Sequence, residues 1–110
     1  MAGAKIIALY PHPTDAAAFE KAYMDEHMVL ARQMGNKTGA LKMTATKFAE
    51  TPQGKPLYYR MFEFHYPSME KLQAALGDPV AQKTVGHATQ ISTGGAPIIM
   101  VSAESQEISL

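Results

Sequence analysis

Short apolar runs alternate with amphipathic stretches along the chain. The first run, AKIIALY at residues 4–10, is rich in β-forming side chains and is followed by Pro11 and Pro13. Because proline cannot donate a hydrogen bond to a β-ladder, we expect a strand that ends at this point. Runs of similar character predict three more strands, at residues 40–48, 57–66 and 97–103.

The segment after the first strand has the period of an amphipathic helix. Side chains at three- and four-residue steps form a single stripe, which consists of Phe19, Tyr23, His27, Leu30, Ala31 and Met34. Thr14 can cap the start of this helix, and Asp15 suits the positive end of its dipole. We expect the helix to end at Gly35-Asn36, because both residues tolerate a positive φ.

Two shorter helices are predicted between the third and fourth strands. Pro67-Ser68 begins the first helix, and Gly77 to Pro79 interrupt its pattern. Asp78 can then cap a second helix that has Pro79 in its first position. The inward stripe of that helix consists of Ala81, Thr84, Val85, Ala88 and Ile91. The final residues, ESQEISL, predict a polar tail that can add an edge contact in a partner.

The resulting order, β-α-β-β-α-α-β, is the split βαβ pattern of α+β proteins. Right-handed crossovers place the helices on one face of a four-stranded antiparallel sheet, with the first and third strands in the centre and the second at an edge. A chain of 110 residues has room for one such domain, and we assign residues 1–110 to it.

The helix-free face of this sheet is expected to need a partner. A face in contact with water alternates into polar residues, and only the second strand does so, with Lys42, Thr44 and Thr46. The first and last strands are apolar on both sides, which would leave a larger exposed apolar patch than soluble monomers tolerate. Two such faces would bury on the order of 800 Å² per partner. We therefore expect a homodimer that pairs sheet to sheet with C2 symmetry.

Composition excludes several classes of function. Ten basic residues balance ten acidic ones and do not cluster, so we expect no nucleic-acid partner. The chain has no cysteine, which excludes disulfides, thiolate catalysis and thiolate metal sites. The apolar run near the N-terminus is too short for a signal peptide or a membrane span. These features predict a cytoplasmic protein with no membrane contact.

His27 is the first candidate for chemistry. It lies within the helical stripe and therefore faces the sheet, where burial keeps an imidazole neutral and able to accept a proton or orient a substrate. Tyr10 lies where the first strand leaves the sheet, at the mouth of any pocket between the layers, and its hydroxyl can donate a hydrogen bond. The alternatives are a core histidine bonded to a backbone carbonyl and a tyrosine that only packs.

Four side chains of the third strand are candidate substrate contacts. By the two-residue period, Glu63 and His65 share a face with Tyr59, and Arg60 lies on the other. Glu63 and His65 can serve as acid and base, Tyr59 can donate a hydrogen bond, and Arg60 can bind an anion. The alternative is hydrogen bonding or ion pairing between subunits.

We predict no metal and no cofactor. His-x-His and His-x-x-x-His spacings are absent, and Glu63-x-His65 offers only two ligands on one face. The chain also lacks a Gly-rich phosphate loop and a nucleophile elbow. Its methionines and aromatic residues instead suit a small hydrophobic or aromatic ligand.

Three segments resemble the EthD family, named for ethyl tert-butyl ether degradation: KIIALYPHPTDAAAFEKAYMDEHMVLA, PLYYRMFEFHYPSMEKLQAAL and ISTGGAP. The most specific part is a strand that ends in Tyr10-Pro11, followed by a helix with the run Glu-His-Met-x-Leu at Glu26 to Leu30. His27 matches the helical histidine of this pattern. The chain departs from it at His87 and Ile91, where family members often carry an acidic residue and an aromatic.

The resemblance implies a fold and a role. EthD-like proteins are similar to the dimeric α/β-barrel superfamily, whose ferredoxin-like subunits pair their sheets into a barrel. The family name implies breakdown of a small organic compound, and the superfamily includes cofactor-free monooxygenases, isomerases and lyases as well as haem enzymes.

Two hypotheses about function follow from these observations. The first is a cofactor-independent enzyme acting on a small apolar or aromatic compound, with His27 as base or orienting group and Tyr10 as hydrogen-bond donor. The second is a non-catalytic binder or accessory protein of a degradation pathway. A second ionisable group that converges with His27 would favour the enzyme, and the sequence reveals none.

Overall fold

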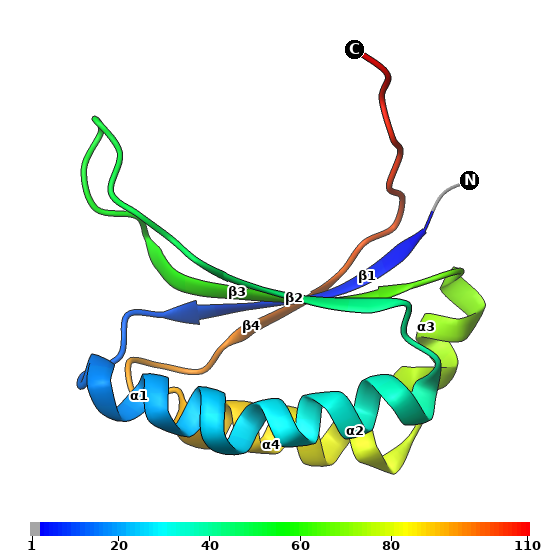
Figure 1. Ribbon diagram of the computed structural model, residues 1–110, viewed down its shortest axis with the longest axis horizontal. Coiled ribbons are helices and arrows are strands. Elements are labelled where there is room, and N and C mark those ends of the chain that lie inside the picture. The colour runs from blue at the N-terminus through cyan, green and yellow to red at the C-terminus, as the bar shows by residue number, and fades with distance from the viewer. Residues whose placement is uncertain (1–2) are drawn as a thin grey trace.

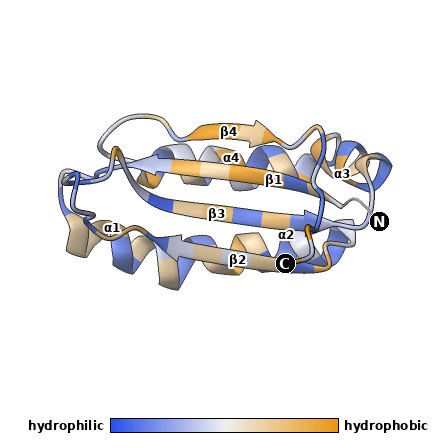
Figure 2. Ribbon diagram, turned by 90° about the horizontal axis from the view of Figure 1, so that it is seen from above, coloured by the Kyte–Doolittle hydropathy of each residue, from blue (hydrophilic) through white to orange (hydrophobic). Residues whose placement is uncertain are grey.

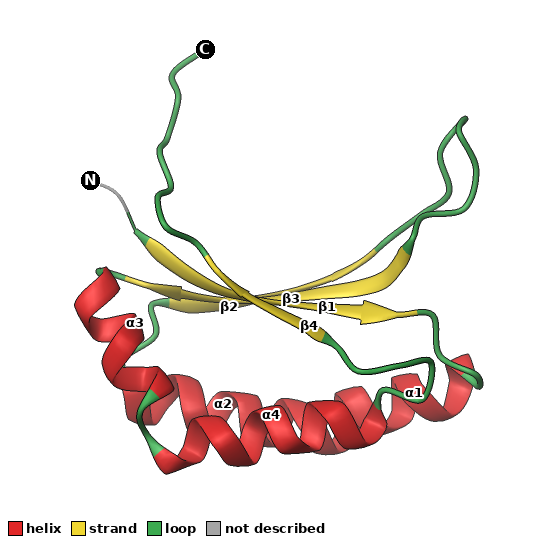
Figure 3. Ribbon diagram, turned by 180° about the vertical axis from the view of Figure 1, so that it is seen from behind, coloured by secondary structure: helices red, strands yellow, loops and turns green. Residues whose placement is uncertain are grey.

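Residues 3–110 are described by the computed structural model, and their elements follow the predicted order. These elements are β1 (Ala4–Pro11), α1 (Ala16–Ala22), the π-helix η1 (Tyr23–His27), α2 (Met28–Thr38), β2 (Lys42–Lys47), β3 (Tyr58–Tyr66), α3 (Met69–Leu76), α4 (Pro79–Ile91) and β4 (Ile98–Val101). The strands form one antiparallel sheet in the order β2-β3-β1-β4, and the helices cover one face of it (Figures 1 and 3). The split βαβ prediction is confirmed. No helix among the described residues is both long and apolar enough to cross a membrane.

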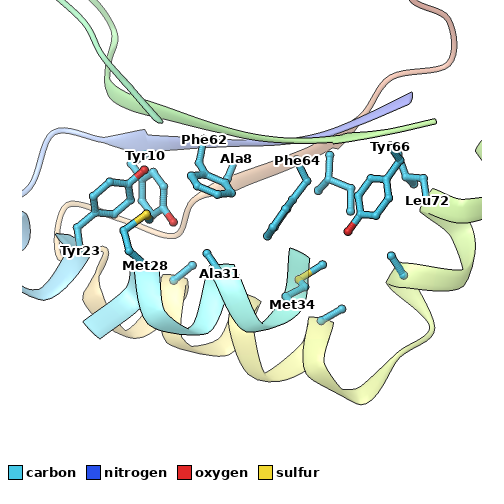
Figure 4. Close-up of a cluster of buried hydrophobic side chains, with 14 of the residues drawn as sticks. Ala8, Tyr10, Tyr23, Met28, Ala31, Met34, Phe62, Phe64, Tyr66 and Leu72 are labelled. Carbon is cyan, nitrogen blue, oxygen red and sulfur yellow. The ribbon is translucent and has the colours of Figure 1, made fainter. Parts of the chain in front are cut away.

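The core fills the space between the sheet and the helices. Alternate residues of β1 are buried and face the helices, and the aromatic side chains of β3 extend the same surface. The helical layer meets them with a stripe of side chains close to the predicted one. Figure 4 shows how the two layers interdigitate, with Phe62, Phe64 and Tyr66 of β3 above Met28, Ala31 and Met34.

The long helical segment begins and ends one to four residues away from the predicted positions. Asp15, not Thr14, is the N-cap, and its carboxylate accepts a hydrogen bond from the amide of Ala18. The helix continues through Gly35 and ends at Gly39, whose φ of 79° is left-handed. Gly35 is buried within the helix on the side of Met43 of the sheet, and its backbone is helical instead of forming a turn.

Substituting these two glycines separates their roles. A Cβ on Gly35 would meet the Met43 sulfur at 3.5 Å, an ordinary contact, so Gly35→Ala is expected to stabilise the fold by about 0.5–1 kcal/mol through helix propensity. Gly39→Ala is expected to destabilise it by about 1–2 kcal/mol, because its backbone is left-handed. Urea unfolding measures both changes. If both substitutions changed the free energy of unfolding in the same direction, the assignment of the helix end to Gly39 would be contradicted.

A β-bulge near the start of β3 changes the direction of Tyr59. Tyr10 of β1 lies opposite Arg60 and the next residue, Pro11, lies opposite Tyr58, so Tyr59 is an extra residue in the ladder. The Tyr59 ring packs edge-on against Phe19 of α1, with ring centroids 5.7 Å apart. The prediction that Tyr59 shares a face with Glu63 and His65 is therefore wrong, because strict alternation fails at the bulge.

The helix-free face of the sheet, called the open face below, has an apolar half and a polar half. The apolar half lies mainly on β1 and β4, which Figure 2 shows as the most hydrophobic strands, and consists of Ile7, Leu9, Met61, Ile98 and Met100. On the polar half, Glu63 lies 3.6 Å from Lys5, and the His65 ring is hydrogen-bonded to Thr44. The tail that follows β4 projects from this side of the sheet (Figure 1).

Candidate functional site

A small apolar cavity lies between the sheet and the helices. Its volume is about 40 Å³, room for roughly three water molecules. The sheet contributes Ile6, Ala8, Tyr10, Phe62 and Phe64 to its wall, and α2 and α4 close the other side. At its rim lie three partly exposed apolar side chains, Leu76, Val85 and Ile99.

The polar groups that line this cavity come from three side chains. Tyr10 descends from β1 (Figure 4), His27 rises from the π-helix, and Thr84 belongs to α4. The Thr84 hydroxyl donates to the carbonyl of Val80 in its own helix. The cavity therefore offers a ligand one polar end, formed by the phenol of Tyr10 and the imidazole of His27.

A single π-helical turn places His27. Between α1 and α2 the backbone widens over Tyr23–His27, and the amide of Met28 bonds back to the carbonyl of Tyr23. Tyr23 and His27 are both buried on the side that faces the sheet, with their rings nearly parallel and centroids 5.9 Å apart. Isolated π-helical turns are frequent at functional sites. The feature thus marks the segment that carries the predicted histidine.

The structure brings the two predicted residues Tyr10 and His27 together, and Tyr10 is buried in the cavity wall instead of lying at its mouth. The Tyr10 hydroxyl lies 3.3 Å from Nε2 of His27. The two side chains are 1% and 3% exposed, so the contact is shielded from water. Phe19 and Tyr23 pack edge-on against the Tyr10 ring and hold it in place.

A second histidine, which the sequence reasoning missed, completes the site. Nδ1 of His87 in α4 lies 3.0 Å from Nδ1 of His27, and the two rings are nearly parallel. On its outer side, Nε2 of His87 lies 3.7 Å from a carboxylate oxygen of Glu26. His87 falls three residues after Thr84 of the predicted stripe, and this spacing is the signal that places it on the inward edge of the helix.

Burial controls the charge of these groups. Burial, and after it the neighbouring His87, lowers the pKa of His27 from 6.5 to about 4. Burial also raises the pKa of Tyr10 far above its usual value, so both partners are neutral at neutral pH. Tyr23 is affected in the same way, with a pKa raised to about 12. Its buried hydroxyl has no hydrogen-bond partner among the described residues.

The other predicted site residues lie outside the cavity lining. Arg60 makes a two-pronged hydrogen bond to Glu20, at 2.7 and 2.8 Å, and this bond lowers the pKa of the Glu20 carboxyl. Tyr59 packs near the same end of the sheet, and Glu63 and His65 lie on the open face. A role for these four in binding substrate stays a prediction.

The site has few groups for a metal ion. His27 and His87 offer nitrogen ligands, but Nδ1 of each ring is engaged with the other. Across residues 3–110, no group of three His, Asp or Glu side chains has the arrangement of a metal site.

Comparison with known proteins shows which proteins this chain resembles in sequence and in fold. The chain matches no protein-family model. It is 22% identical over 101 residues to an uncharacterized 11.0 kDa protein from the thcB–thcC intergenic region of Rhodococcus erythropolis, covering 92% of this chain and 95% of that protein. An EthD family protein from Bacillus halodurans has a crystal structure that superposes with a TM-score of 0.82 at 29% identity, covering 94% of this chain and 99% of that one. The chain is similar to this EthD family protein in both sequence and fold, and is called EthD-like below.

Other solved structures share the fold of this EthD-like chain. An EthD-like protein from Ralstonia eutropha has a TM-score of 0.67 at 22% identity, over 93% of this chain and 91% of that one. A dimeric ferredoxin-like protein of unknown function from Jannaschia has the same TM-score at 14% identity, over 93% and 98%. A hydroxynitrile lyase from Passiflora edulis reaches 0.69 at 8% identity, over 99% and 97%. The predicted ferredoxin-like fold is confirmed.

Protonation of His27 links the site to the stability of this EthD-like chain. Between pH 6.5 and about 4 the unfolded chain binds a proton at His27 that the folded chain does not, so stability decreases as the pH falls through this window, by about 3 kcal/mol in total. His27→Gln removes this contribution and retains the other titrating groups nearby, namely His87, Glu26 and Tyr10. Urea unfolding across this range is expected to show a shallower pH dependence for the variant. Identical slopes would contradict burial of a neutral His27.

Proposed function

We propose that this EthD-like chain is a cofactor-independent enzyme that acts on a small apolar or aromatic compound with one oxygen function. The observation that carries the proposal is the polar end of the cavity, where the hydroxyl of a buried tyrosine lies 3.3 Å from Nε2 of a buried, neutral imidazole. His27 is the base or orienting group, and Tyr10 binds the oxygen of the ligand. The apolar walls accept the remainder of the compound.

Similarity to known proteins supports the class of reaction. The EthD family is named for the degradation of a small ether, and a role in breaking down an organic compound is part of the proposal. Two proteins with the same fold are described as a hydroxynitrile lyase and a cofactor-independent oxygenase. At 8% and 15% identity these two support the proposal by analogy of fold.

The second ionisable group at the site favours an enzyme over a binder. A protein that only stores a hydrophobic ligand needs an apolar cavity and one hydrogen bond. Here His27 also contacts His87, which reaches toward the surface and Glu26. A pair of coupled imidazoles beside a phenol is a typical arrangement for moving protons.

The first experiment identifies the natural ligand and tests the site with a probe. Native mass spectrometry of freshly purified protein is expected to reveal a small apolar compound. Phenol, which combines an aromatic body with one oxygen, is larger than the 40 Å³ cavity, so its entry requires the exposed rim side chains Leu76, Val85 and Ile99 to move apart. It is expected to bind there and to shift the imidazole resonances of His27. The Tyr10→Phe variant is expected to bind phenol about tenfold more weakly, because one hydrogen bond to the ligand is lost. Its affinity for benzene is expected to be unchanged.

Two outcomes would contradict this proposal. The first is phenol binding that the Tyr10→Phe variant leaves unchanged, which would place the ligand elsewhere. The second, once a substrate is identified, is full turnover by a folded His27→Ala variant. A ligand that co-purifies and is never converted would favour the alternative of a binding or accessory protein.

We also propose that two copies of the chain pair through the open face. Two proteins with this fold, from Jannaschia and from Bacteroides fragilis, are described as dimeric. The apolar half of the open face supports the proposal, since Ile98 and Met100 remain 43% and 41% exposed on it. Burying such residues is the dominant favourable contribution to association.

A charge placed in the apolar half tests this pairing. Leu9→Lys is expected to weaken the dimer by about 2 kcal/mol or more, roughly thirtyfold in the dissociation constant, measured by sedimentation equilibrium. Val29→Lys is the matched control, because Val29 is 48% exposed on the helical layer and lies away from the open face. Pairing through the sheet would be contradicted if both variants weakened the dimer equally, or if neither variant weakened it.

A further inference from the structure

A continuous line of polar side chains connects the cavity with the surface. It runs from the Tyr10 hydroxyl to His27 over 3.3 Å, from His27 to His87 over 3.0 Å, and from His87 to Glu26 over 3.7 Å. Exposure rises along this line. Tyr10 and His27 are buried, the His87 side chain is 17% exposed, and that of Glu26 is 66% exposed. One end thus touches the cavity and the other touches water.

The hydrogens along this line have one arrangement that satisfies every contact. Only one Nδ1 of the two histidines can carry a hydrogen, because the two nitrogens face each other. The Glu26 carboxylate, 3.7 Å from Nε2 of His87, favours a hydrogen on that nitrogen, which leaves Nδ1 of His87 as the acceptor. His27 then donates from Nδ1, and its bare Nε2 accepts from the Tyr10 hydroxyl. Every donor points outward, from the cavity toward the surface.

We propose that Tyr10, His27 and His87 form a proton relay that exchanges protons between a ligand in the cavity and water near Glu26. This inference rests on the proposed function and adds to it a residue, His87, that acts through His27. It also defines the substrate class more narrowly. The ligand must present a weakly acidic O–H or C–H group to the Tyr10 oxygen, beside an apolar body.

The proton balance of the relay is simple. The ligand gives its proton to the Tyr10 oxygen as the Tyr10 proton moves to Nε2 of His27. The Nδ1 proton of His27 moves to Nδ1 of His87, whose Nε2 proton leaves to water or to Glu26. No electrons are gained or lost, and the same steps in reverse return a proton to the ligand. The ligand anion then accepts a hydrogen bond from Tyr10, which is again a neutral phenol.

The environment favours transfer along the chain over a charged intermediate. Burial disfavours imidazolium at His27 and tyrosinate at Tyr10. A relay that shifts all its protons together leaves both residues neutral before and after each transfer. The charged and titratable groups around His27 are those of the line itself, together with Tyr23 of the π-helix, whose ring lies beside the imidazole.

A purely structural role for His87 can be distinguished from the relay by substitution. A partner that only fixed the ring of His27 would need a single acceptor, which any amide oxygen supplies. His87→Gln tests the difference, because the glutamine oxygen can accept from Nδ1 of His27 but cannot pass a proton on. His12→Gln is the matched control, since His12 bonds to the Pro56 carbonyl in a loop outside this line.

The measurement is the exchange of the His27 Nδ1 proton with solvent, observed by NMR on the full chain. We expect His87→Gln to slow this exchange about tenfold or more, and His12→Gln to leave it unchanged. Glu26→Gln, a surface change that the fold tolerates, is expected to slow it by a smaller factor. Exchange at the wild-type rate in a folded His87→Gln variant would overturn the relay.

The relay and the proposed function fail in different ways. His87 does not line the cavity, so His87→Gln is expected to bind phenol as the wild type does. If wild-type protein does not bind phenol through Tyr10, the proposed function is lost whatever the exchange rates show. If phenol binds and the His27 Nδ1 proton exchanges at the same rate in His87→Gln as in the wild type, the proposed relay is wrong and the proposed function stands. If His87→Gln does not fold, the Glu26→Gln rate decides the question.

Discussion

The hydrogen bond between Tyr10 and His27 is buried away from bulk solvent, and this constraint determines how the site is built. A buried polar atom without a partner costs about 1–3 kcal/mol, so each of these side chains needs the other. The second nitrogen of His27 has the same requirement, and His87 meets it. The imidazole is therefore held on both sides, neutral, at the single polar end of an apolar cavity. The proposed chemistry follows from that position.

Much of this arrangement follows from the periodicity of the sequence. A helical stripe that includes His27 must face the sheet, since its other members are apolar. Tyr10 falls on the same side of β1 as Ile6 and Ala8, which alternate with half-exposed residues. These two short-range patterns bring Tyr10 and His27 to the same space between the layers. The fold class and the main pair of the site were predictable for this reason.

The remaining features depend on packing that short-range patterns do not encode. His87 meets His27 only because α4 lies beside the π-helix at a particular rotation. Tyr59 turns toward the helices because a bulge adds a residue to β3. The helix continues through Gly35 to Thr38, because Gly39 and not Gly35 adopts the left-handed φ that ends it. The pairing of Arg60 with Glu20 likewise joins residues 40 positions apart in the chain.

The protonation state of His27 tests the central claim most directly. A long-range ¹H–¹⁵N correlation spectrum of histidine-labelled protein near neutral pH reports which ring nitrogen carries a hydrogen. We predict a neutral His27 ring with the hydrogen on Nδ1 and a bare Nε2 that accepts a hydrogen bond from Tyr10. A positively charged ring, or a hydrogen on Nε2, would contradict it.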